Sequence, residues 1–312
     1  MKASLLCCLV FVLLGIEVAL AQTPMSFEYH QSLIFVKARI NGSRTNYLFL
    51  LNTGANRTVV DKQIADLLKI PVKKGKDSVI GTAGKESVSI CKLRSLQVGD
   101  ATEHNMVVTC RALQNVMMVN GRKVDGILGT DFLKHYAVAI DFSKLKLTFN
   151  SNKPVSRTSI PFQMHDGIPK FVVKLDDTLT TTLHYNSGVS MATSRYTYVN
   201  ISRAQFNRLK SINPYMKHNS YISGRGVGGD VNLQVLKINR MELNGYAIRH
   251  PYLILQPEEG CFKAEDAVGF FGNNLLEKYQ SIVIDFPGEK LYFNKVAPKK
   301  ALKTRKQLIA SK

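Results

Sequence analysis

Two short segments of the sequence combine hydrogen-bonding side chains with a glycine that permits a tight turn. Each begins with asparagine, continues with a hydroxyl residue and a glycine, and ends with a small or branched apolar residue. An asparagine amide donates and accepts hydrogen bonds but does not titrate near neutral pH, so it cannot act as a general base. The segments therefore favour recognition over acid–base chemistry. Their residues are Asn52, Thr53, Gly54 and Ala55, then Asn186, Ser187, Gly188 and Val189.

The two segments belong to two copies of a longer pattern. The stretch 124–129 (Val-Asp-Gly-Ile-Leu-Gly) aligns with 268–272 (Val-Gly-Phe-Phe-Gly), and Ile-Asp-Phe occurs at both 140–142 and 284–286. A repeat this long indicates a duplicated domain, because the repeats of a solenoid span only tens of residues. We expect lobes at 27–150 and 159–296, joined by a polar linker at 151–158.

Similar elements precede the glycine motif in each copy. Runs rich in strand-forming residues predict strands at 33–40 and 45–51 around Asn41-Gly42, and at 171–175 and 178–184 around Asp176-Asp177. Apolar spacing after each motif predicts a short helix that buries one face. The residues expected on these faces are Ile64, Leu67 and Leu68 before Pro71, and Phe206, Leu209 and Ile212 before Pro214.

Together these patterns resemble the pepsin and retropepsin superfamily of aspartic peptidases, especially its bacterial exported members. In that family each lobe carries an apolar residue followed by Asp-Thr/Ser-Gly-Ala/Ser, and later two apolar residues and a glycine that pack beneath the Asp loop. Here residues 51–55 and 127–129 match the two parts of this pattern in the first lobe. Residues 185–189 and 270–272 match them in the second lobe. The resemblance implies a mostly β, two-lobed pepsin/retropepsin-like acid protease barrel fold with short helices.

Both positions of the family's catalytic aspartates hold asparagine, namely Asn52 and Asn186. The family's reaction needs two carboxylates that share one proton, because one acts as base and the other as acid. Each such group contributes about 100-fold to 10,000-fold, so losing both predicts loss of turnover. Asparagine nevertheless matches aspartate in size, and two facing amides can hydrogen-bond to each other. We therefore expect the loop geometry to survive.

The resemblance also implies roles for the residues around the two asparagines. The hydroxyls of Thr53 and Ser187 are expected to hydrogen-bond across the interface between the lobes. The stretch 80–84 would form the tip of a hairpin flap over the cleft, with 224–229 as its counterpart, although a plain glycine-rich loop fits either stretch. The implied substrate-binding residues are Thr53, Gly54, Ala55, Ser187, Gly188, Gly81, Thr82, Ala83, Gly84 and Gly226.

A few titratable residues near the motifs need a separate interpretation. His184 precedes Asn186 by two positions and by strand alternation could share its face, which makes it the best substitute base. A histidine satisfied by neighbouring strands is the alternative that we favour. The spacing of Asp125, Asp141 and Asp285 indicates support of loops and turns.

Residues 1–21 have the features of a secretory signal peptide, with Lys2, an apolar run and the sequence Ala-Leu-Ala at 19–21. We therefore expect export to the periplasm or the medium of a bacterium, with no membrane span. Export permits a disulfide between Cys91 and Cys110, with Cys261 left over. We expect no cofactor and no metal, because no metal-ligand spacing is evident.

The formal net charge is +19, and its lysines and arginines are scattered along the chain. Without an aromatic-interleaved basic motif, this charge does not favour nucleic acid as a partner. The basic stretch 297–312 is expected to be a solvated tail.

Three hypotheses for function follow. The leading one is an inactive pseudopeptidase monomer that binds a peptide or extended protein segment between its lobes. The others are an active secreted endopeptidase and a cationic protein that binds anionic envelope polymers.

Overall fold

The computed structural model describes residues 23–81, 84–113, 118–119, 122–149, 159–190, 196–216, 220–226 and 229–293. The expected signal peptide, linker and basic tail lie outside these residues, as do Thr82 and Ala83. Among the residues that are described, strands predominate and the helices are short. The fold is the two-lobed, mostly β architecture that the sequence predicts.

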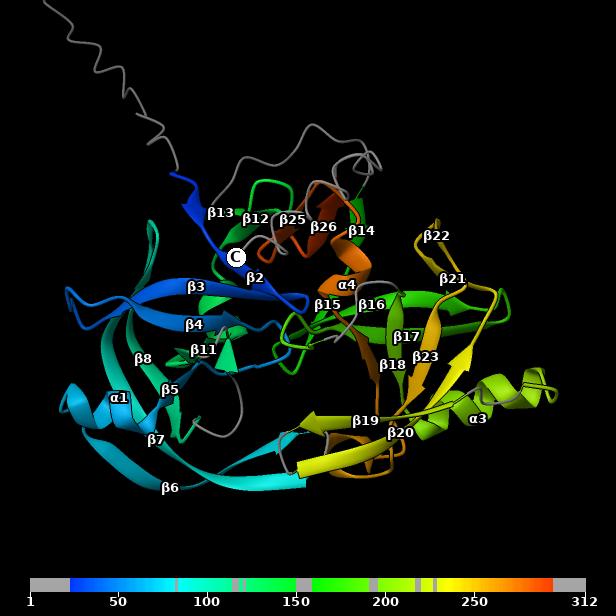
Figure 1. The fold of residues 1–312 in the computed structure, drawn as a ribbon, viewed down its shortest axis with the longest axis horizontal. Helices are drawn as coiled ribbons and strands as arrows, with labels where there is room; N and C mark the ends of the chain where they lie inside the picture. The colour runs from blue at the N-terminus through cyan, green and yellow to red at the C-terminus, as the bar shows by residue number, and fades with distance from the viewer. Residues whose placement is uncertain are drawn as a thin grey trace, which may run out of the picture.

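The N-terminal lobe is built on an eight-stranded sheet with the order β2-β3-β4-β11-β5-β8-β7-β6 (Figure 1). Its strands are β2 (Glu28–His30), β3 (Leu33–Ile40), β4 (Tyr47–Leu51), β5 (Val59–Asp61), β6 (Val72–Gly81), β7 (Gly84–Val98), β8 (Ala101–Arg111) and β11 (Gly126–Leu128). Accompanying elements are the small pair β9 (Met118–Val119) and β10 (Arg122–Lys123), with helices α1 (Lys62–Leu67) and α2 (Thr130–Leu133).

The C-terminal lobe is built on a ten-stranded sheet with the order β19-β20-β23-β18-β24-β17-β16-β21-β22, in which β15 also pairs with β16. Its strands are β15 (Gln163–His165), β16 (Ile168–Leu175), β17 (Leu179–Tyr185), β18 (Tyr198–Ile201), β19 (Ser220–Gly226), β20 (Gly229–Lys237), β21 (Arg240–Leu243), β22 (Tyr246–Arg249), β23 (Tyr252–Leu255) and β24 (Gly269–Phe271). Its helices are α3 (Arg203–Ile212), the 3-10 turn η1 (Gly260–Phe262) and α4 (Asn273–Leu276).

A six-stranded sheet joins the two halves of the chain in the order β1-β13-β12-β25-β26-β14. It contains β1 (Met25–Ser26), β12 (Ala137–Asp141), β13 (Lys146–Phe149), β14 (Ser159–Pro161), β25 (Ser281–Asp285) and β26 (Lys290–Phe293). Strands β12 and β25 pair antiparallel at its centre, so the strands that carry the repeated Ile-Asp-Phe segments lie beside each other (Figure 1). Ile140 and Ile282 are both fully buried there. The duplication is thus also a structural one, with matching strands in contact.

In each lobe the motif segment follows a strand that pairs parallel with a second strand. All five residues of β4 are buried, and β4 pairs with β11; in the other lobe β17 pairs with β24, whose three residues are buried. Parallel strands covered on both faces carry nearly continuous apolar runs, which explains the sequences of β4 and β24. Strand β17 differs, because only Leu179, Leu183 and Tyr185 are buried in it. The backbone N–H of Asn52 donates to the Leu128 carbonyl, and that of Asn186 donates to the Phe271 carbonyl, each at 2.9 Å. The predicted packing of the later apolar pair beneath each loop is confirmed.

The two predicted hairpin turns are confirmed. Asn41 and Gly42 have φ of 53° and 76°, and Asp176 and Asp177 have φ of 49° and 57°. Two successive residues with positive φ give the tight turn that matches the twist of antiparallel strands, and Asn, Asp and Gly tolerate it best.

Both predicted helices form, but the expected buried faces are partly wrong. Leu67 is 70% exposed and Ile212 is 48% exposed, whereas Ala65, Phe206 and Leu209 are buried. Leu67 is the last residue of α1 and Ile212 the last of α3, so each lies where its helix leaves the sheet surface. Helix α3 is fixed to the sheet instead by Gln205, which donates to Thr181 Oγ1 and the Thr182 carbonyl and accepts from the Gly269 N–H.

Candidate functional site

The loops that carry Asn52 and Asn186 meet between the lobes. A Cβ atom placed on Gly54 would collide with the side-chain amide of Asn186, and one on Gly188 would collide with the amide of Asn52. Each asparagine therefore lies over the glycine of the opposite loop, and any larger residue at either glycine would separate the loops. This confirms that the glycines allow close approach of the lobes.

The hydroxyls of Thr53 and Ser187 bind the two loops to each other. The Thr53 N–H donates to Ser187 Oγ and the Ser187 N–H donates to Thr53 Oγ1, each at 2.9 Å. The hydroxyls then donate onward, from Thr53 to the Tyr185 carbonyl at 2.7 Å and from Ser187 to the Leu51 carbonyl at 2.9 Å. Both side chains are fully buried. The predicted hydrogen bonds across the interface are confirmed, and they are reciprocal.

The oxygen atom of each asparagine amide is held inside its own loop. Asn52 Oδ1 accepts from the Gly54 N–H at 2.8 Å, and Asn186 Oδ1 accepts from the Gly188 N–H at 3.0 Å. Among the residues that the structure describes, no hydrogen bond joins the two amides. The amide-to-amide pairing that two facing asparagines permit is therefore not formed, and each side-chain oxygen is instead oriented toward a backbone N–H of its own loop.

Asn273 is a bridging residue that the sequence did not reveal. Its Nδ2 donates to the Ser32 carbonyl in the N-terminal lobe at 2.7 Å and to the Ser187 carbonyl at 3.2 Å. Its Oδ1 accepts from the Tyr185 hydroxyl at 2.6 Å, and burial raises the pKa of Tyr185. Asn273 is fully buried. A polar residue directly after the closing glycine of the motif was the only sequence signal for it.

Asp131 holds the N-terminal loop in a related way. Its Oδ1 accepts from the backbone N–H and the hydroxyl of Thr58, at 2.9 and 2.6 Å. Thr58 Oγ1 in turn accepts from the N–H of Gly129 at 3.1 Å, which ties the loop to the closing glycine. Burial raises the pKa of Asp131, and the hydrogen bonds from Thr58 oppose that rise. This carboxylate supports the loop and was also missed.

The aspartates that were expected to support turns do so. Asp125 Oδ2 accepts from the Leu48 N–H at 2.7 Å, beside the strand that leads to Asn52. Asp141 Oδ1 accepts from the Ser143 N–H at 2.9 Å, and Asp285 Oδ1 from the Gly288 N–H at 3.0 Å. Each of these bonds closes a turn or strand end, as predicted.

His184 does not join the two asparagines. Its ring lies 6.1 Å from that of His165, and its Nε2 is buried with no hydrogen-bond partner in the described structure. Burial lowers the pKa of His184 to about 4, and positive charge on Lys170 and His165 lowers it further while Asp166 opposes. The expected substitute base is thus an uncharged side chain packed toward β15 and β16. The alternative, a histidine enclosed by neighbouring strands, describes it better.

The hairpin predicted as a flap forms and reaches the opposite lobe. Strands β6 and β7 pair up to Gly81 and Gly84, and both strands contact η1 of the C-terminal lobe (Figure 1). A Cβ on Gly260 would collide with the Gly81 carbonyl oxygen, and Gly260 has a φ of 53°. The second hairpin, β19–β20, pairs as far as Gly226 and Gly229. Gly224 lies within β19, two residues before the tip.

The cysteines expected in the mature protein are all free. Cys91 and Cys110 are buried on adjacent strands and their thiols hydrogen-bond to each other. The disulfide that the sequence permits is not formed here. Cys261 lies in η1 and is exposed.

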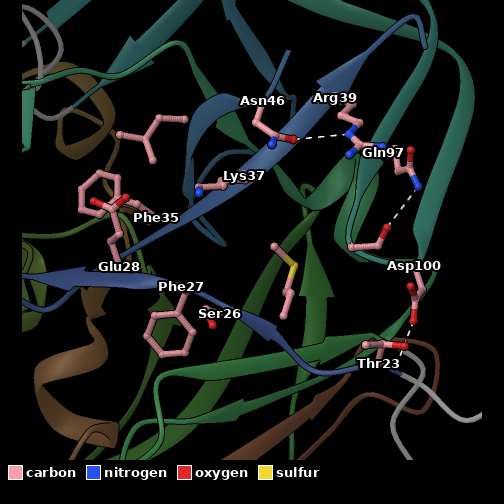
Figure 2. A pocket seen from close by; sticks show the side chains of 13 residues that line it. Thr23, Ser26, Phe27, Glu28, Phe35, Lys37, Arg39, Asn46, Gln97 and Asp100 are labelled. Carbon is pink, nitrogen blue, oxygen red and sulfur yellow. Dashed lines mark hydrogen bonds between the residues drawn. The ribbon is translucent and has the colours of Figure 1, made fainter. Parts of the chain in front are cut away.

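A cavity of about 460 Å³ lies away from the asparagine loops, on the N-terminal lobe (Figure 2). Strands β1 and β2 form one wall, and β3 contributes Phe35, Lys37 and Arg39 to another. Arg39 donates to Asn46 Oδ1 at 3.3 Å, and the Thr23 N–H donates to Asp100 Oδ2 at 2.9 Å. No motif residue lines this cavity.

Two further features bear on the expected partners. In the described part of the chain, no helix is long and apolar enough to cross a membrane. The same residues contain no group of three or more His, Cys, Asp or Glu that could hold a metal ion.

Comparison with known proteins finds a sequence match within the N-terminal lobe. Residues 36–132 match a family model described as aspartyl protease, and this range includes the Asn52 loop and most of the N-terminal lobe. No curated protein matches the chain. Among solved structures, the aspartic proteinase from Irpex lacteus matches with 11% identity and a TM-score of 0.49, covering 89% of this chain and 98% of that one.

Replacing Thr53 by Val should test the reciprocal bonds between the loops. The variant keeps the shape but leaves the buried Ser187 N–H and Tyr185 carbonyl without their partner, at a cost of about 1–3 kcal/mol for each group. We expect the free energy of unfolding in urea to fall by about 2–6 kcal/mol. Thr45→Val at an exposed position is the matched control. An equal effect of both changes would contradict the assignment.

Replacing His184 by Gln should remove a pH dependence of stability. With a folded pKa of about 4 against the ordinary 6.5, the unfolded chain binds a proton first as the pH falls. Stability is then full above pH 6.5 and declines toward pH 4, by about 2 kcal/mol after allowance for partial exposure. Unfolding in urea across this range should be flatter for His184→Gln than for the wild type. The exposed His104→Gln should leave the slope unchanged.

Replacing Gly260 by Ala should loosen the contact of the first flap with η1. The new methyl would meet the Gly81 backbone and also strain the positive φ. Gly245→Ala, at a φ of 86° with no atom within 4 Å, reproduces the strain alone. We expect backbone amide exchange near the tip of β6–β7 to accelerate about tenfold in Gly260→Ala only, which corresponds to about 1.4 kcal/mol. Equal exchange in both variants would argue against flap docking.

Proposed function

We propose that this protein is an exported, non-catalytic aspartic-peptidase homologue of a bacterium, which binds extended peptide or protein segments between its lobes. The observation that carries the proposal is the pair of loops at Asn52 and Asn186. Reciprocal hydrogen bonds between Thr53 and Ser187 hold these loops together, while the two positions that would need carboxylates hold amides.

The absence of an acid and a base at these positions supports a binding role. Amide hydrolysis by this arrangement needs one group to take a proton from water and another to give one to the substrate. The amides of Asn52 and Asn186 neither take up nor release a proton near neutral pH. His184 is turned toward β15 and β16. The partly buried Asp131 carboxylate accepts hydrogen bonds from the N–H and hydroxyl of Thr58. Loss of two groups worth about 100-fold or more each leaves no effective catalysis.

The surroundings of the Asn186 loop support a peptide as ligand. Val189, the last residue of this motif, packs with Tyr198 against a small buried cluster of Val231, Leu233 and Ile254. Two members of this cluster belong to strand β20 of the second hairpin, and Ile254 belongs to β23. Val189 and Tyr198 are only partly buried, and ligand pockets combine such apolar surface with a few polar groups that fix orientation. An extended peptide, with alternating side chains and main-chain polar groups, fits that combination.

A peptide digest combined with calorimetry tests the proposal. The wild-type protein should cleave no member of a random decapeptide pool at any pH, yet bind peptides from that pool. Asn52→Asp combined with Asn186→Asp should gain cleavage at acidic pH, because the loops already hold the required positions. Asn46→Asp combined with Asn207→Asp, two exposed positions in different lobes, adds the same charge and should gain none.

Cleavage by the wild-type protein would contradict the loss of activity. Failure of every peptide to bind would contradict the binding role.

A further inference from the structure

We propose that the paired asparagines offer their two unpaired Nδ2 groups as hydrogen-bond donors to a ligand, and that the ligand atom is an oxygen with negative or partial negative charge. A carboxylate and a peptide carbonyl both supply such an oxygen. This inference deepens the proposed function and rests on it only for the identity of the physiological ligand. Two aspartate carboxylates at the same positions would accept hydrogen bonds, whereas the two Nδ2 groups donate them.

The orientation of each amide follows from its own loop. The Gly54 N–H points at one terminal atom of Asn52, and the Gly188 N–H points at one terminal atom of Asn186. A rotated amide would place its NH₂ group against an N–H donor, leaving two donors facing each other. The oxygen must therefore face the glycine, and Nδ2 must face away from it. Neither Nδ2 has a hydrogen-bond partner among the described residues.

The cross-lobe hydroxyls and the N–H groups of the two asparagines are already occupied. The Thr53 and Ser187 hydroxyls each accept one cross-lobe N–H and donate to a carbonyl. The N–H groups of Asn52 and Asn186 are held by β11 and β24. Each asparagine oxygen accepts one glycine N–H, so Nδ2 is the atom of each amide that has no partner in the described structure. Both asparagines are partly exposed, so a ligand can reach them.

Two unpaired Nδ2 donors favour ligands that bring a hydrogen-bond acceptor. A group that can only donate, such as an ammonium, finds no partner at either Nδ2. A carbonyl oxygen accepts one or both N–H bonds, and a carboxylate forms shorter and stronger charge-assisted ones. An aspartate at either position would put an oxygen where Nδ2 now lies and would repel a carboxylate. The substitution of both aspartates thus changes what the site recognises as well as what it can catalyse.

The test observes the asparagine NH₂ groups directly by two-dimensional ¹H–¹⁵N NMR of the purified protein. Signals of Asn52 and Asn186 are assigned by their loss in the single Asn→Asp variants. Acetate serves as carboxylate probe, N-methylacetamide as peptide-carbonyl probe and methylammonium as donor-only probe. We expect acetate or N-methylacetamide to shift both NH₂ pairs, and methylammonium to shift neither. A stronger response to acetate assigns a carboxylate as the ligand group, and a stronger response to the amide assigns a main-chain carbonyl.

Charge controls complete the design, because acetate also associates weakly with a basic surface. Asn52→Asp with Asn186→Asp should weaken acetate binding by at least about tenfold, the effect of losing about one charge-assisted hydrogen bond. Asn46→Asp with Asn207→Asp carries the same net charge and should bind acetate as the wild type does.

Three outcomes would overturn the inference: unmoved NH₂ signals with both oxygen probes, an equal response to methylammonium, or equal weakening in the two double variants. Failure of the proposed function is separate from these. If no peptide binds while acetate shifts both NH₂ pairs, the donor site stands and the peptide-binding role does not. If peptides bind without moving the NH₂ signals, the peptide-binding role stands and the donor site does not.

Discussion

The exchange of hydrogen bonds between Thr53 and Ser187 is the interaction on which the site depends. Each residue gives its N–H to the other's hydroxyl, and each hydroxyl then bonds a carbonyl of the strand that leads into the opposite loop. Because both residues are fully buried, any loosening would leave polar groups without partners and without water. The relative position of the lobes is thereby fixed at the point where the asparagines lie.

Several other elements act through this exchange. The glycines at 54 and 188 leave room for the opposing amides, Asn273 connects Ser187 to Ser32 of the other lobe, and Asp131 holds the segment behind Asn52 through Thr58. None of these contacts requires a carboxylate at position 52 or 186. This independence explains physically how the two loops keep their geometry with amides at both positions. Asparagine fills the same volume and lets its oxygen take the same glycine N–H.

Much of the fold could be predicted because the duplication shows the sequence pattern of each main element twice, once in each lobe. Strand β3 has the predicted bounds, both hairpin turns have positive φ at the expected residues, and β11 and β24 pack beneath their loops. The errors are at the helix ends, where Leu67 and Ile212 are exposed. Periodicity assigns a face to a helix, but only the position of the sheet decides how far along the helix that face is covered. Asn273 and Asp131 were missed for a similar reason, since their partners come from distant parts of the chain.

The side-chain chemistry of the site depends on contacts that the sequence alone does not show. Two asparagines considered alone permit an amide pair, but the backbone N–H groups of Gly54 and Gly188 orient each side-chain oxygen toward its own loop. This orientation leaves both NH₂ groups directed away from their loops. His184 shows the same dependence on context, because strand alternation placed it near Asn186 while packing against His165 left it uncharged and unpaired. Residue type fixes which groups are present, and the surrounding backbone decides which of their atoms a ligand can meet.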